Sequence, residues 1–209
     1  MKKMIAIALA AVMLLCSMAV LVSCTEEESF SAAYDKALAS IDYDASEYTK
    51  TLVVAISPDF APMEFYDTAK SGNDAIVGFD VLLATYIAKE LGMKLKFEPM
   101  SFDACMAAVA SGNADLAISG FSWTAERAET FLISDYYIAG ENETEQVLIT
   151  LKENAGKYDT AEKLKGVKVG AQGASLQEQL VLDQLPDSEL ILNADLGTLV
   201  LQLKSGEFD

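Results

Sequence analysis

Thr51-Leu52-Val53-Val54-Ala55-Ile56 is the stretch on which the prediction of the fold depends. A continuous apolar run that ends at a loop (residues 57–62) is typical of a strand buried on both faces. Strand and helix patterns then alternate along the chain. We predict a helix over 79–91, a strand over 94–98, a helix from 101 to the turn at 111–113, and a strand over 115–118. This order predicts an α/β fold with a largely parallel sheet covered by helices.

Two residues fit the ends of the first of these helices. Asp80 lies near its start and Gly92 just beyond its end, positions that helix caps favour. After Tyr137 the rhythm restarts, which predicts strands over 146–151, 167–170 and 189–192 and helices over 160–164, 175–182 and 196–203. We therefore expect two lobes, residues 50–140 and 141–209. The second stops where another strand should begin, so we expect it to be incomplete in this chain.

The N-terminus has the pattern of a bacterial leader. Met1-Lys2-Lys3 is positively charged, and residues 4–22 carry no charge. Such a run is long enough to span a bilayer, so a transmembrane anchor is one interpretation. The alternative comes from Leu21-Val22-Ser23-Cys24, which resembles the lipobox of bacterial lipoproteins. That resemblance implies that residues 1–23 are a signal peptide and that Cys24 carries lipid, such as diacylglycerol and palmitate, on the extracytoplasmic face of the cell membrane.

The charge of the chain excludes several kinds of partner. Without the leader, 13 basic residues face 32 acidic ones, a net charge of −19. A nucleic-acid partner is excluded, because phosphate binding needs a basic face. Electrostatic attachment to anionic lipids is also disfavoured, so the lipid on Cys24 must anchor the protein. Residues 24–49 are acidic and weakly periodic, which predicts a tether with at most a short helix. We expect a monomer.

Cysteine and histidine usage argues against metal and acid–base chemistry. Cys16 leaves with the leader and Cys24 is lipidated, so Cys105 remains alone, and neither a disulfide framework nor a zinc cluster is predicted. Cys105 lies in an apolar helical pattern, which favours a buried free thiol. Histidine, the commonest general acid–base and metal ligand, is absent. We predict no cofactor, no metal and no catalytic residue.

Several stretches together resemble one protein family. In order and spacing they are similar to the amino-acid-binding branch of bacterial solute-binding proteins, family 3. These stretches are residues 60–65 (FAPMEF), 77–81 (VGFDV), 101–104 (SFDA), 111–116 (SGNADL), 119–127 (SGFSWTAER), 134–137 (SDYY) and 169–175 (VGAQGAS). The resemblance runs from about residue 51 to the end. It implies a periplasmic-binding-protein-like fold, in which two lobes close over an amino acid on a hinge, and a partner permease of an ABC importer.

Arg127 is the first candidate for binding the ligand, because it is the only arginine in the chain. A planar guanidinium matches a carboxylate better than a lysine does. A surface or salt-bridging arginine is the alternative. Ser122 would add its N–H and hydroxyl to the same carboxylate. The resemblance implies that Gly120, with Ser119 beside it, turns a carbonyl toward the ligand ammonium. A plain strand-to-helix turn capped by Ser122 or Thr124 is the alternative and is compatible with binding.

Three further residues are candidates from their family positions. The resemblance implies that the rings of Phe60 and Phe102 flank the ligand side chain, with ordinary core positions as the alternative. Ser175 begins a predicted helix, whose exposed N–H groups would complete the carboxylate site unless Ser175 is only a helix cap. Trp123 is predicted to lie in the core or the pocket wall. The resemblance also implies that an acidic residue of the second lobe binds the ligand ammonium. We expect that residue to lie beyond Asp209.

The chain departs from the family pattern at two positions. Leu82 stands where an acid is usual, at a position without ligand contact in the family. Ser57 stands where members that bind basic amino acids often carry an acid. This second departure predicts a polar or neutral amino acid as the ligand.

Two other function classes share this scaffold. A dehydratase is one, but it needs a positioned acid or base, and without histidine only carboxylates, lysines and tyrosines remain. The sensing domain of a membrane receptor is the other, and it needs a transmembrane segment after the second lobe. A binding protein without catalysis is the prediction that the sequence favours.

Overall fold

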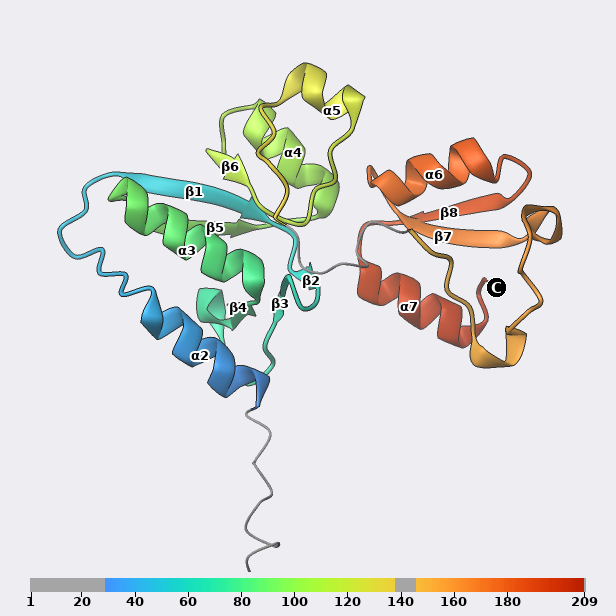
Figure 1. The fold of residues 1–209 in the computed structure, drawn as a ribbon, viewed down its shortest axis with the longest axis horizontal. Helices are drawn as coiled ribbons and strands as arrows, with labels where there is room; N and C mark the ends of the chain where they lie inside the picture. Colours follow the sequence, from blue (N-terminus) through green and yellow to red (C-terminus); the bar gives the residue numbers. More distant parts are fainter. Residues whose placement is uncertain (1–28, 138–145, 209) are drawn as a thin grey trace, which may run out of the picture. The chain divides into compact units, whose positions relative to one another are not determined.

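The computed structural model describes residues 29–137 and 146–208 (Figure 1). The chain divides into two units, residues 1–36 and 37–209, and the contacts described below lie within the second. The first lobe contains β1 (Thr51–Ile56), β2 (Asp59–Phe60), β3 (Glu64–Tyr66), β4 (Ile76–Val77), α3 (Phe79–Leu91), β5 (Lys94–Pro99), α4 (Phe102–Ala110), β6 (Leu116–Ala117) and α5 (Ala125–Thr130). The second lobe contains β7 (Lys168–Gln172), α6 (Leu176–Gln184), β8 (Glu189–Asn193) and α7 (Leu196–Ser205).

Strand β1 is the centre of a parallel sheet with the order β5-β1-β6. Thr51 pairs with Lys94 at one end and Ile56 with Pro99 at the other. Val54, Ala55 and Ile56 have no exposed surface, as expected of a strand with neighbours on both edges and cover on its faces. Helix α4 packs on β1 and α3 on β5. The predicted parallel α/β architecture is confirmed.

Cys105 on α4 lies in this core, with Ala55, Ala108 and Ala114. Its side chain is completely buried and free, and burial raises the pKa of the thiol to about 12. The prediction of a buried free thiol at Cys105 is confirmed, and the raised pKa keeps this thiol protonated at physiological pH.

Helix α3 has the predicted bounds but a different N-terminal cap. Gly92 ends it in the left-handed conformation, with φ +63°, as predicted. The cap residue at the start is Gly78, and Asp80 lies inside the first turn with no exposed surface. The prediction of Asp80 as a capping residue is wrong, because its carboxylate faces the protein interior instead of the helix end.

The first lobe also contains a small antiparallel sheet of the order β2-β3-β4, in which Phe65 pairs with Val77.

The segment that precedes β1 is more ordered than a tether. Helix α2 (Phe30–Ser40) precedes a stretch in which the Tyr43 hydroxyl donates to Met93 O at 3.0 Å and accepts from Leu95 N at 2.6 Å. The tether prediction for 24–49 is thus wrong from residue 37 onward, because this part packs on the first lobe.

The second lobe is built on the parallel pair β7 and β8, in which Lys168 pairs with Glu189. Val169 packs with Val181 of α6, whereas a Cβ on Gly170 would meet Leu199 of α7 at 3.0 Å. Because successive residues of a strand face opposite sides, α6 and α7 cover opposite faces of the pair. Figure 1 shows the two helices on either side of β7 and β8.

The predicted strand over 146–151 does not form. Residues 146–149 are exposed, and no strand of the described chain pairs with this segment. A strand is stabilised by its hydrogen-bonded neighbour, so an apolar pattern alone does not produce one. The predicted helix over 160–164 is a 3-10 turn, Ala161–Leu164.

The leader and Cys24 lie outside the described residues, as does Asp209. Of the helices in 29–137 and 146–208, none is long and apolar enough to span a bilayer.

Candidate amino-acid site

The carboxyl ends of the three parallel strands bring the predicted residues of the first lobe together. Strand β1 leads into Ser57, β5 leads into Phe102, and β6 leads into Ser119 and Gly120. In open α/β sheets ligands bind at this edge, because the loops that follow the strands diverge there. Ser57 N donates to Ser119 Oγ at 2.9 Å, which links the first of these loops to the third.

Gly120 is a glycine that its surroundings require. Its φ is +59°, in the left-handed region, and a Cβ at this position would lie 3.1 Å from the ring of Phe60. The Gly120 N–H points inward to Asp80 Oδ2 at 3.2 Å. Its carbonyl accepts no hydrogen bond from the described part of the chain. The contact of this carbonyl with a ligand ammonium, which the family resemblance implies, stays a prediction.

Ser119 directs its side chain into the protein. Its side chain is 2% exposed, and its hydroxyl donates to Glu64 Oε1 at 2.5 Å. The hydroxyl therefore supports the loop from below and is not presented to a ligand. Glu64 and Asp80 were not predicted as part of the site, although both lie within motifs that carry the family resemblance.

Arg127 lies at the start of α5 and is half-buried. Its NH1 donates to Ser122 O at 2.5 Å and its NH2 to Ala174 O at 2.8 Å. Burial lowers the pKa of the guanidinium, and Glu126 opposes this shift. Within residues 29–137 and 146–208 the guanidinium forms no ion pair. The salt-bridge alternative for Arg127 therefore finds no partner there.

Two aromatic rings hold the guanidinium in place. Phe102 and Phe121 are stacked, with centroids 4.4 Å apart, and the Arg127 Cζ lies 5.7 Å and 5.5 Å from them. Such positions favour a cation by its attraction to the ring face. Phe121 was not predicted as part of the site. Its position in the sequence between two predicted site residues, Gly120 and Ser122, could have indicated it.

The predicted capping alternative is confirmed for the turn before α5. Thr124 Oγ1 accepts from Arg127 N at 3.1 Å, so Thr124 is the cap. The hydroxyl and N–H of Ser122 make no hydrogen bond with the described residues, which leaves both for the predicted carboxylate. Trp123 is 52% exposed and does not line the cavity, so its predicted place in the core or pocket wall is wrong.

The two phenylalanine candidates differ in burial. Phe60 is 44% exposed, with its ring over Gly120, whereas Phe102 is only 8% exposed. Phe60 therefore has ring surface that is open to a ligand, while the ring of Phe102 is largely covered and stacks on Phe121. Their direct contact with a ligand side chain stays a prediction.

In the second lobe, Ser175 is the N-terminal cap of α6. Its hydroxyl donates to Gln172 O at 2.7 Å and accepts from Glu178 N at 3.1 Å. Glu178 Oε2 in turn accepts from Ala174 N at 2.6 Å, which is a variant of the capping box. The predicted contact of Ser175 with a carboxylate stays a prediction, and an incoming anion would compete with Glu178.

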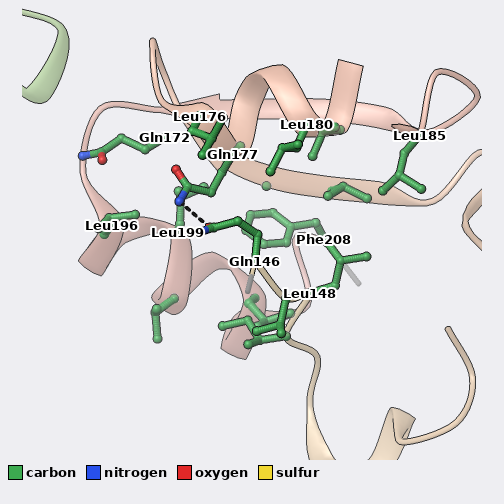
Figure 2. A pocket seen from close by; sticks show the side chains of 18 of the residues that line it. Gln146, Leu148, Gln172, Leu176, Gln177, Leu180, Leu185, Leu196, Leu199 and Phe208 are labelled. Atoms are coloured by element: carbon green, nitrogen blue, oxygen red, sulfur yellow. Dashed lines mark hydrogen bonds between the residues drawn. The ribbon is translucent and has the colours of Figure 1, made fainter. Parts of the chain in front are cut away.

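A cavity of about 890 Å³ is lined in the first lobe by Phe60, Phe102, Ser119, Gly120, Ser122 and Arg127, whereas Ser175 does not line it. Most of its lining belongs to the second lobe, where Figure 2 shows Leu176, Leu180, Leu199 and Phe208 around an apolar space and Gln146 bound to Gln177. An apolar space is unsuited to a zwitterion, because burying a charge without a partner is costly. The candidate site is therefore the part lined by the first lobe, which includes Arg127, the only charged residue among the described residues of the lining. Among the described residues no cluster suited to a metal ion occurs.

Comparison with known families identifies the family to which the chain belongs. The family described as "Bacterial extracellular solute-binding proteins, family 3" matches residues 52–186, more than half of the chain. The chain belongs to this family. Arginine-binding extracellular protein ArtP of Bacillus subtilis (strain 168) is 32% identical to this family 3 protein over 77% of the chain and 59% of ArtP. The chain thus spans about three fifths of the length of this curated relative.

Solved structures confirm the periplasmic-binding-protein fold of the family 3 chain. The substrate-binding protein AbpA from Streptococcus pneumoniae Canada MDR_19A, bound to L-arginine, is 44% identical with a TM-score of 0.68, over 76% of this chain and 65% of AbpA. The ancestral amino acid-binding protein AncCDT-1, a precursor of cyclohexadienyl dehydratase, is 32% identical with a TM-score of 0.67, over 76% of this chain and 67% of AncCDT-1.

Proposed function

We propose that this protein binds a free amino acid between lobes 50–140 and 141–209 and delivers it to the permease of an ABC importer. The observation that carries the proposal is the environment of Arg127. Its guanidinium lies over the stacked rings of Phe102 and Phe121 in the cavity lining, and it forms no ion pair with a carboxylate of the described chain. Two of its five N–H donors bind carbonyl groups, so three remain for a ligand carboxylate.

The remaining polar groups suit the rest of an amino acid. Ser122 offers an N–H and a hydroxyl beside Arg127, and Gly120 offers a carbonyl for the ammonium. Neither supplies an acid or base for chemistry, and ArtP and AbpA are named as binding proteins. We therefore propose capture and release of the ligand without a reaction.

We propose a basic amino acid, arginine first, as the ligand. The prediction of a neutral ligand depended on Ser57, but Ser57 is 3% exposed and its hydroxyl donates to Asp59 Oδ1 at 3.1 Å. A buried residue does not select a ligand side chain by direct contact, so its lack of charge carries little weight. The exposed ring of Phe60, which lines the cavity, offers a cation an aromatic neighbour. The name of ArtP as an arginine-binding protein and the L-arginine bound to AbpA support the same choice.

Calorimetric titration of the full-length protein with L-arginine, L-lysine, L-glutamine and L-glutamate tests this ligand class. We expect L-arginine to bind at least about tenfold more tightly than L-glutamine, a difference of about 1.4 kcal/mol. L-glutamate should be the weakest, because the lining holds no second cation. Tighter binding of L-glutamine than of both basic amino acids would restore the neutral ligand predicted from Ser57.

We further propose that lipid on Cys24 attaches the protein to the outer face of the cell membrane, with residues 1–23 removed. The leader and the lipobox-like sequence support this proposal. Replacing Cys24 with serine removes the acceptor sulfur, so we expect no incorporation of labelled fatty acid and an uncut leader. Cys105→Ser is the matched control and should label like the wild type. Labelling of the Cys24→Ser protein would contradict lipidation at this residue.

A further inference from the structure

Two carboxyl groups lie beneath the Ser119-Gly120 loop. Glu64 is on β3 and Asp80 on α3, and their side chains are 1% and 0% exposed. Neither forms an ion pair within residues 29–137 and 146–208. Carboxylates buried without a cation are costly, since charge in a low-dielectric interior needs a partner. Both side chains are buried away from a ligand, so their burial needs an explanation other than ligand contact.

Hydrogen bonds satisfy two of the four carboxyl oxygens of Glu64 and Asp80. Glu64 Oε1 accepts from Ser119 Oγ at 2.5 Å. Asp80 Oδ2 accepts from Tyr137 Oη at 3.1 Å and from Gly120 N at 3.2 Å. Glu64 Oε2 and Asp80 Oδ1 are buried and find no donor in the described chain, and the two side chains lie within hydrogen-bonding reach of each other. A proton on one carboxyl group lets it donate to the other, because a protonated carboxyl group is itself a donor.

We propose that Glu64 is the protonated and Asp80 the ionised member of a carboxylic acid–carboxylate pair, which positions the Ser119-Gly120 backbone for amino-acid binding. The role in binding rests on the proposed function, whereas the pair itself does not. Asp80 is the better place for the charge, since it accepts from Tyr137 and from the Gly120 amide, a group that can only donate. Glu64 accepts from a single hydroxyl.

The acidity of the two groups agrees with this assignment. Burial raises the pKa of Glu64 to about 9, far above its ordinary value of 4.5, and the negative charges of Asp80 and Asp59 act in the same direction. Burial also raises the pKa of Asp80, but hydrogen bonds from Tyr137, Glu64 and Gly120 oppose that shift. Glu64 therefore keeps the proton at neutral pH.

The pair fixes the site through its two hydrogen-bonded ends. Glu64 holds the Ser119 hydroxyl, which also accepts from Ser57 N at 2.9 Å, and Asp80 holds the amide of Gly120. These bonds keep Gly120 in its left-handed conformation beneath Phe60. Glu64 and Asp80 are thus positioning residues, which act on the ligand only through the loop.

Glu64→Gln and Asp80→Asn distinguish the two members. Glutamine reproduces a protonated acid, since its oxygen accepts from Ser119 and its NH₂ donates to Asp80, so we expect an affinity within about threefold of the wild type. Asp80→Asn removes the charged acceptor of Gly120 N and Tyr137, and we expect at least a tenfold loss. The exposed controls Glu90→Gln and Asp74→Asn should bind like the wild type. A larger loss in Glu64→Gln than in Asp80→Asn would overturn the assignment.

The pH dependence of unliganded stability tests the pair without any ligand, and so separates its failure from that of the proposed function. Between its ordinary pKa of 4.5 and about 9, the unfolded chain ionises Glu64 while the fold keeps it protonated. Stability is thus lost as pH rises through this range. The titratable neighbours Asp59, Asp80, Tyr137 and Cys105 are common to wild type and Glu64→Gln, so the comparison isolates Glu64.

We expect the melting temperature of Glu64→Gln to exceed that of the wild type by a margin that grows from pH 5 to about pH 9. Glu90→Gln, in contrast, should follow the wild type at every pH. Infrared spectra of the unliganded wild type at neutral pH should show the C=O band of a protonated carboxylic acid, which Glu64→Gln should lack. A pH-independent difference in melting temperature, or a wild type without this band, would overturn the proposal.

Discussion

Replacing Arg127 with alanine is expected to weaken amino-acid binding by about 2–5 kcal/mol, or roughly 30- to 5,000-fold. The loss is large because truncation leaves the ligand carboxylate without its cation at the one charged position of the cavity lining. Calorimetry against the tightest-binding amino acid measures it. Arg127→Lys keeps the charge but loses the planar fork, so it should recover only part of the affinity.

The unliganded protein should also become less stable in Arg127→Ala. The carbonyl groups of Ser122 and Ala174 lose a charged donor, and the stacked rings of Phe102 and Phe121 lose their cation. We expect a cost of about 1–2 kcal/mol, because the side chain is only half-buried. Affinity must therefore be measured where all variants are folded.

Lys96→Ala is the control for Arg127→Ala. It removes an exposed positive charge of the first lobe that pairs with Glu98, and it should leave affinity unchanged. Equal affinity of Arg127→Ala and wild type, with a large fall in unliganded stability, would show that Arg127 is structural.

Replacing Gly120 with alanine is expected to weaken binding by about tenfold or more. The left-handed φ of +59° is unfavourable for alanine, and the new Cβ would lie 3.1 Å from the ring of Phe60. Strain of this kind costs about 1–3 kcal/mol, and its relief must displace either the loop or the ring. Both face the proposed ligand, so titration calorimetry should detect either movement.

Gly112→Ala is the matched control, because it separates backbone strain from the contact with Phe60. Gly112 has a φ of +73°, but a Cβ there would have no neighbour within 4 Å. We expect both variants to lose stability and only Gly120→Ala to lose affinity. An unchanged affinity in Gly120→Ala would place the Ser119-Gly120 loop outside the site.

The parts of the fold that the sequence predicted well are those whose pattern is fixed by their own burial. Strand β1 and helix α3 have the predicted bounds, because one is apolar throughout and the other repeats its apolar residues with helical spacing. The segment 146–151 is also largely apolar but forms no strand among the described residues, because strand formation depends on a partner that the pattern does not specify.

The candidate site shows the same limit at the level of side chains. Arg127 was predicted from its uniqueness, and the motif around it placed Gly120 and Ser122 nearby. The sequence did not predict that Glu64 and Asp80 approach each other, because sixteen positions separate them and each belongs to a different element. Nor did it place Phe121 beside Arg127, since a single aromatic residue in a loop belongs to no periodic pattern of apolar residues. Both placements depend on contacts between elements that are distant in the sequence.

The central claim is that the Arg127 guanidinium binds the carboxylate of an amino acid. A double-mutant cycle tests it most directly, with wild type and Arg127→Ala titrated against the tightest-binding amino acid and against its carboxamide, which lacks the negative charge. We predict that the carboxamide binds wild type more weakly by about 2–5 kcal/mol and that Arg127→Ala no longer distinguishes the two ligands. Equal preference of both proteins for the carboxylate would contradict the claim.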